Sequence, residues 1–108
     1  MTLFSTILNN NYMSEISIAD FNKIKPRAQI IDVRETYEYE TGNIQKSINI
    51  PMNDILQSTD KIDKTKTLII YCQTGRRAAA VVYMLKRKYG FKNAYNLKGG
   101  FSEYQDKI

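Results

Sequence analysis

Residues 67–78 read TLIIYCQTGRRA and join an apolar run to a cysteine, a glycine and two arginines. The continuous apolar, β-branched run over 67–71 is typical of a central parallel strand that is covered on both faces. Cys72 follows at the carboxyl end of this strand. The segment 78–89, rich in Ala, Val, Met and Leu, predicts a largely buried helix that Gly90 ends. The stretch therefore predicts a strand, a short loop and a helix.

Strands and helices alternate along the rest of the chain. This alternation predicts an α/β fold, an open parallel sheet of about five strands with helices on both faces. In such folds a ligand binds just beyond the carboxyl ends of the strands, where Cys72 lies. We expect strands over 29–33, 47–50 and 93–97, a helix capped by Ser17 and ended by Pro26, helical segments over 35–40 and 53–56, a loop with a helical turn over 57–66, and a short helix from Gly99-Gly100 through Tyr104.

The length of 108 residues is that of one domain. The pattern of a folded domain begins just after Met13. We therefore expect a disordered N-terminal extension over 1–13 and one domain over 14–108. The sequence leaves open whether Met1 or Met13 is the initiator. The first residues lack the basic region of a signal peptide, and no segment approaches the length of a transmembrane helix. A lone cysteine is compatible with a reducing compartment, so a cytoplasmic location is predicted.

Two features of the composition exclude several kinds of site. The chain contains no histidine, which removes Ser–His and Cys–His pairs and the commonest transition-metal ligand. One cysteine can form neither an internal disulfide nor a Cys-rich zinc site. We therefore predict no metal site and no cofactor.

The chain is basic, with 16 Lys and Arg against 11 Asp and Glu and a formal charge of +5. This charge suits anionic partners. The lysines are scattered, however, and no dense basic run with interleaved aromatic residues occurs, so a solvated surface explains most of them. The tyrosines are also scattered, and packing explains them better than a stacking platform. We expect neither nucleic acid nor a membrane as a partner.

The loop after Cys72 favours a negative charge at its centre. Gly75 permits a positive φ, so the loop can curl until successive main-chain amides point inward. The start of the following helix adds partial positive charge, and Arg76 and Arg77 add formal charge. The sulfur of Cys72 lies where it can carry this negative charge. The positive charge around it, rather than a base, would then activate it as a nucleophile. The alternative is an inert buried thiol; the glycine and the paired arginines favour the functional interpretation.

Short landmarks spread over about residues 15–105 resemble the rhodanese family of sulfurtransferases in order and spacing. Each landmark is weak alone, but the combination is specific. Two departures occur: Asn43 stands where the family often has histidine, and Tyr104 where it often has tryptophan. Both positions are expected to be structural. The landmarks are Asp32-Val33-Arg34-Glu35, Glu38-Tyr39, Gly42-Asn43-Ile44, Ser47-Ile48-Asn49-Ile50-Pro51, Cys72 to Arg77, and Leu97-Lys98-Gly99-Gly100-Phe101.

The resemblance implies a single rhodanese domain in which Cys72 is the nucleophile. In that family the loop cysteine takes the sulfane sulfur of a donor such as thiosulfate, holds it as a persulfide and passes it to cyanide or a thiol. The implied partners are therefore a small anionic sulfur donor and a thiol or protein acceptor. The residues implied to bind substrate, chiefly through their main-chain amides, are Gln73, Thr74, Gly75, Arg76 and Arg77.

The two arginines of the loop have different implied roles. Arg76 would face the mouth of the loop and attract the donor, whereas Arg77 would brace the loop through a carboxylate such as Glu38 or Asp32. Asp32 and Arg34 could line the pocket, but an ion pair that supports the rim of the sheet is the favoured interpretation.

Three alternatives stay open. The chain could be an intracellular persulfide carrier between partner proteins, a cysteine-dependent phosphatase or arsenate reductase, or a non-catalytic binding module. The related phosphatases use a Cys-x5-Arg loop, whereas Cys72 to Arg77 is Cys-x4-Arg, a tighter loop that suits a single sulfur atom. Inactive modules commonly lack the cysteine, which counts against the third alternative.

Overall fold

The computed structural model describes residues 14–106, and its strands form one parallel sheet in the order β1-β5-β4-β2-β3. This confirms the predicted α/β fold. The extension expected over 1–13, and with it the question of Met1 or Met13 as initiator, lies outside the described residues. The strands are β1 (Glu15–Ile16), β2 (Gln29–Asp32), β3 (Ile48–Asn49), β4 (Leu68–Tyr71) and β5 (Ala94–Leu97).

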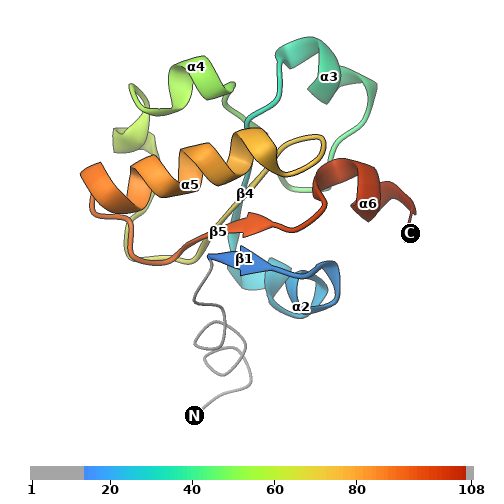
Figure 1. The fold of residues 1–108 in the computed structure, drawn as a ribbon, viewed down its shortest axis with the longest axis horizontal. Helices are drawn as coiled ribbons and strands as arrows, with labels where there is room; N and C mark the ends of the chain where they lie inside the picture. The colour runs from blue at the N-terminus through green and yellow to red at the C-terminus, as the bar shows by residue number, and fades with distance from the viewer. Residues whose placement is uncertain (1–13, 107–108) are drawn as a thin grey trace.

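Helices cover both faces of this sheet. Figure 1 shows α5 running along one face and α2 lying on the other. The helices are α2 (Ile18–Ile24), α3 (Thr36–Thr41), α4 (Met52–Ile55), α5 (Arg76–Lys88) and α6 (Gly100–Asp106), with 3-10 turns η1 (Lys25–Arg27) and η2 (Thr59–Lys61).

The central strand β4 explains why residues 67–71 form a continuous apolar run. All four residues of β4 are fully buried. Because side chains alternate along a strand, Leu68 and Ile70 join a core cluster with α5, whereas Ile69 and Tyr71 join a second cluster with α2 and α6. A strand with a core on each face needs apolar residues at every position.

Most predicted elements are found, with small shifts at their ends. The Ser17 hydroxyl caps α2 by accepting the Asp20 amide at 3.1 Å. The start predicted for the long helix, at residue 78, is wrong by two residues. Gly75 at φ 109° is the N-cap, so the helix begins at Arg76. The strand β1 is a feature that sequence periodicity missed, because it has only two residues and exists through its pairing with β5.

Candidate active site

The loop from Cys72 to Arg77, hereafter the Cys72 loop, joins β4 to α5 at the carboxyl edge of the sheet. The side chain of Cys72 is buried. Its sulfur accepts the main-chain amide of Gly75 at 3.1 Å and that of Ala78 at 3.4 Å. Gly75 belongs to the segment expected to supply these donors, and Ala78 follows directly after it. Amides aimed at a sulfur stabilise negative charge on that atom.

Three carbonyl groups of the Cys72 loop accept hydrogen bonds from other parts of the chain. The carbonyl of Cys72 accepts the amide of Phe101 at 2.8 Å, and that of Gln73 accepts the amide of Ser102 at 3.0 Å. The Asn96 side chain donates to the Gly75 carbonyl at 3.1 Å. With their carbonyls bound by α6 and β5, these residues can turn their amides toward the inside of the loop.

Gly100 allows α6 to approach the Cys72 loop this closely. Its φ is +63°, and a Cβ at this position would lie 2.5 Å from the carbonyl oxygen of Cys72 and 2.6 Å from that of Gln73. The sequence analysis placed Gly99-Gly100 at the start of the last helix and among the family landmarks, without connecting the pair to the Cys72 loop. The glycine pair was the available signal, whereas nothing in the sequence pointed to Asn96.

A buried ion pair supports the Cys72 loop from β2. The guanidinium of Arg34 lies 2.7 Å from the carboxylate of Asp32, and both side chains are almost completely buried. Burial alone would lower the pKa of Arg34, but the hydrogen bond and charge of Asp32 outweigh it and raise that pKa. Arg34 also donates to the side-chain oxygen of Gln73 at 3.0 Å and to the Gly42 carbonyl. The pair therefore lies at the rim of the sheet and reaches the loop.

A second ion pair joins the end of the loop to α3. Arg77 donates to both carboxylate oxygens of Glu38, at 2.8 and 3.0 Å. These bonds hold the pKa of Glu38 at about 2, well below its ordinary value. Glu38 also accepts the main-chain amide of Glu35 at 2.9 Å and thereby caps α3. Of the two carboxylates considered for Arg77, Glu38 is the partner.

The remaining residues of the Cys72 loop lie at its solvent-facing opening. Thr74 and Arg76 are exposed, and Gln73 is half-buried. The Arg76 side chain is therefore accessible to an anion approaching the loop. The structure thus brings together all the site residues selected from the sequence: Asp32, Arg34, Glu38, Cys72, Gln73, Thr74, Gly75, Arg76 and Arg77.

The two departures from the family pattern make ordinary structural contacts. The Asn43 side chain donates to the Tyr39 carbonyl at 3.0 Å. Tyr104 is buried, with its ring centroid 6.0 Å from that of Phe21 and 6.5 Å from that of Phe101. Asparagine and tyrosine therefore fill these positions with a hydrogen bond and with packing.

Neither a metal cluster nor a membrane-spanning helix occurs within residues 14–106. In this part of the chain, no three His, Cys, Asp or Glu side chains gather where they could hold one ion. No helix described there is long and apolar enough to cross a membrane.

Comparison with known proteins gives consistent results. The profile of the rhodanese-like domain matches residues 17–107. An uncharacterized protein of Bacillus subtilis, YqhL, is 36% identical over 104 residues, which cover 96% of this chain and 82% of that protein. The structure of a rhodanese-related protein from Thermoplasma volcanium superposes with a TM-score of 0.80 at 28% identity, covering 86% of this chain and 91% of that one.

A second group of relatives is much longer than this chain. The tRNA uridine(34) hydroxylase of Yersinia pestis is 37% identical over 93 residues, which cover 76% of this chain and 24% of that enzyme. The chain therefore spans about a quarter of the hydroxylase, and the similarity concerns one portion of it.

Proposed function

The chain belongs to the rhodanese-like domain family, and we propose that it is a sulfurtransferase that carries sulfur on Cys72 as a persulfide. The observation that supports this proposal best is the pair of main-chain amides, from Gly75 and Ala78, directed at the sulfur of Cys72. The sequence contains no histidine. A nucleophile activated by surrounding dipoles rather than by a histidine base fits this site.

In the first half-reaction the donor is a small sulfur anion such as thiosulfate. The thiolate of Cys72 attacks the outer, sulfane sulfur of thiosulfate. The sulfur–sulfur bond of the donor breaks, and sulfite leaves with the electron pair. Cys72 then carries one additional sulfur, whose negative charge the loop amides and the nearby Arg76 and Arg77 can stabilise.

In the second half-reaction a nucleophilic acceptor, cyanide or a thiolate, attacks the outer sulfur of the persulfide. The bond between this sulfur and the sulfur of Cys72 breaks, and Cys72 recovers its thiolate with the electron pair. Thiocyanate or a new persulfide is released. Because the sequence has one cysteine, no second cysteine of the same chain can accept the sulfur.

The lone cysteine also supports a second candidate, a persulfide carrier that acts between partner proteins. The chemistry at Cys72 is the same, and the donor and acceptor are then protein thiols. In either role the thiol must be kept free, so we propose that the protein works in the reducing cytoplasm.

Intact mass spectrometry after incubation with thiosulfate tests the proposal. We expect a gain of one sulfur atom, about 32 Da, on Cys72, which a reductant removes. The Cys72→Ser variant is the control and should gain nothing. An unchanged mass of the wild-type protein, or full sulfur transfer by Cys72→Ser, would refute the assignment. Turnover with cyanide, compared with turnover using thiols and persulfide-donating proteins, separates the enzyme from the carrier.

The phosphatase alternative is tested with p-nitrophenyl phosphate. The Cys-x4-Arg loop is one residue shorter than the phosphatase loop, so we expect no hydrolysis that depends on Cys72. Hydrolysis that is lost in Cys72→Ser would favour a phosphatase.

A further inference from the structure

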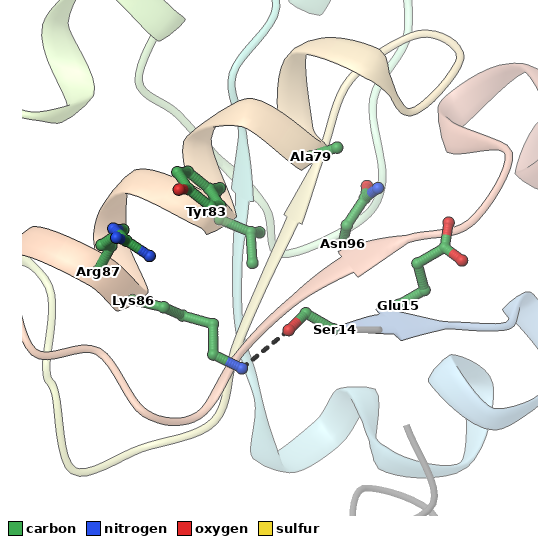
Figure 2. A pocket seen from close by; sticks show the side chains of 8 residues that line it. Ser14, Glu15, Ala79, Tyr83, Lys86, Arg87 and Asn96 are labelled. Carbon is green, nitrogen blue, oxygen red and sulfur yellow. Dashed lines mark hydrogen bonds between the residues drawn. The ribbon is translucent and has the colours of Figure 1, made fainter. Parts of the chain in front are cut away.

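A groove of about 580 Å³ lies beside α5, between this helix and β1. We call it the α5 groove. Figure 2 shows Ala79, Tyr83 and Arg87 along α5 on one side and Glu15 of β1 on the other. A hydrogen bond of 2.8 Å from Lys86 to the Ser14 hydroxyl crosses between the two sides. This volume is in the range of clefts that bind a ligand or a few side chains of a peptide.

The α5 groove begins at the Cys72 loop. Asn96 lines the groove and donates to the carbonyl of Gly75, and the amide of Ala79, another lining residue, donates to the same carbonyl at 3.0 Å. The amide of Gly75 in turn contacts the sulfur of Cys72. A single residue therefore separates the end of the groove from the reacting atom.

The groove contains a buried hydrogen-bond acceptor. Asn96 is 4% exposed, and its side-chain oxygen has no hydrogen-bond partner among the described residues. Figure 2 shows the amide group of Asn96 directed toward the Ala79 end of the groove. Buried polar atoms are almost always paired, so this unpaired oxygen is an unusual feature of the Asn96 end of the groove.

The charge and the exposed side chains of the groove define the occupant further. The lining carries Lys86 and Arg87 against Glu15, so its net charge is positive. Tyr83 is 57% exposed, with the guanidinium of Arg87 at 5.7 Å from its ring centroid. A polypeptide segment with acidic and apolar side chains complements both features, because its carboxylates match the positive charge and its apolar side chains match the exposed ring of Tyr83.

We propose that the α5 groove docks an acidic segment of the protein whose thiol accepts the sulfur from Cys72. This inference rests on the proposed function. The docked thiolate attacks the outer sulfur of the Cys72 persulfide. The bond to the sulfur of Cys72 breaks, Cys72 recovers its thiolate with the electron pair, and the partner leaves as a persulfide.

The length of α5 determines the design of a probe. Arg76 at the loop mouth and Arg87 at the far end of the groove are separated by about 16 Å of helix. An extended chain covers this distance in about five residues. The probe is therefore a peptide with one cysteine, four spacer residues and two glutamates. Matched peptides carry glutamine or lysine in place of glutamate.

The experiment measures single-turnover sulfur transfer from the persulfidated full-length protein to each peptide. We expect the rate constant at low peptide concentration and low salt to be about tenfold higher for the acidic peptide than for the glutamine peptide, and 0.5 M salt to remove the difference. Arg87→Glu should abolish this preference. Lys88→Glu is the matched control, because Lys88 lies in the same last turn of α5 but outside the groove lining.

Binding is measured separately from chemistry, by fluorescence anisotropy of a labelled peptide with serine in place of cysteine on the Cys72→Ser protein. We expect the acidic peptide to bind more tightly than the glutamine peptide and Arg87→Glu to weaken it. Equal transfer rates for acidic and neutral peptides, or equal effects of Arg87→Glu and Lys88→Glu, would overturn the docking proposal. A dimer that Arg87→Glu dissociates would also overturn it, because the groove would then be an interface between copies.

The two proposals fail in different ways. If the wild-type protein forms no persulfide with thiosulfate, the proposed function fails, whatever the anisotropy shows. If it transfers sulfur to cyanide but does not discriminate between the peptides, only the docking inference fails.

Discussion

The main-chain amide of Phe101 donates a hydrogen bond of 2.8 Å to the carbonyl oxygen of Cys72. This bond joins the start of α6 to the start of the Cys72 loop. Together with the bond from Ser102 to the Gln73 carbonyl, it directs two loop carbonyls to α6, while the amides of Gly75 and Ala78 contact the sulfur. The charge environment of the sulfur therefore depends on an element that follows it by about thirty residues.

Replacing Gly100 with alanine should disrupt this contact. The added Cβ would meet the carbonyl oxygens of Cys72 and Gln73 at 2.5 and 2.6 Å, at a φ of +63°. We expect a loss of about 3 kcal/mol in the free energy of unfolding and little persulfide formation in the protein that folds. Urea denaturation and mass spectrometry after thiosulfate treatment measure the two effects.

Gly90→Ala is the control for this prediction. Gly90 has a φ of +74°, but a Cβ there meets only the end of the Lys64 side chain at 3.9 Å. Strain alone should cost about 1 to 2 kcal/mol, with persulfide formation unchanged. If both variants kept normal activity, the proposed importance of the α6 contact would be wrong.

Replacing Asn96 with leucine should separate activity from stability. Leucine removes both the donor to the Gly75 carbonyl and the unpartnered buried oxygen. The Gly75 carbonyl keeps its bond from the Ala79 amide, so stability should change by less than about 1 kcal/mol. We expect persulfide formation to slow by about five- to tenfold, because the loop loses one restraint. A large loss of stability with normal kinetics would contradict this prediction.

Glu38→Gln should lower stability in a pH-dependent way. The Arg77 pair holds the pKa of Glu38 at about 2, below its ordinary 4.5. A lowered carboxyl pKa contributes stability that is fully present above about pH 5 and is lost as pH falls toward 2. At pH 7 we expect the variant to be about 1 kcal/mol less stable, since this pair is partly exposed.

Urea denaturation of both proteins from pH 7 to pH 2 measures this difference. The two curves should converge as Glu38 becomes protonated in the wild-type protein. Glutamine can keep the cap on α3, so helix capping is not what the comparison reports. A difference that stayed constant over this pH range would show that the charge of Glu38 is not responsible.

Arg34→Lys should weaken the support of the loop while it keeps the charge. Lysine cannot supply the planar set of donors that Arg34 directs to Asp32, Gln73 and Gly42. We expect a loss of about 2 kcal/mol in unfolding free energy, and a larger loss for Arg34→Met, which leaves Asp32 buried and unpaired. Adding Asp32→Asn to Arg34→Met should recover part of that loss. Equal stability of the methionine variant and the wild type would contradict this interpretation.

The elements that the sequence predicted depend on neighbouring residues. The strand β4 followed from its apolar run, because a strand buried on both faces excludes polar residues locally. The N-cap of α2 followed from Ser17. Cys72, Gly75, Arg76 and Arg77 are adjacent in the chain, so their presence in one loop was evident before the structure.

Tertiary structure decided the contacts that shape the site. Arg34 and Gln73 are 39 residues apart, as are Glu38 and Arg77, and Asn96 reaches Gly75 across 21 residues. The two-residue strand β1 exists only because β5 pairs with it. Local propensity and periodicity carry no information about such partners, since the order of strands in the sheet determines which residues meet. The sequence by itself therefore determined the fold class and the place of Cys72 at the carboxyl edge of the sheet, and the packing of β2, α3, β5 and α6 around the loop determined which groups surround its sulfur.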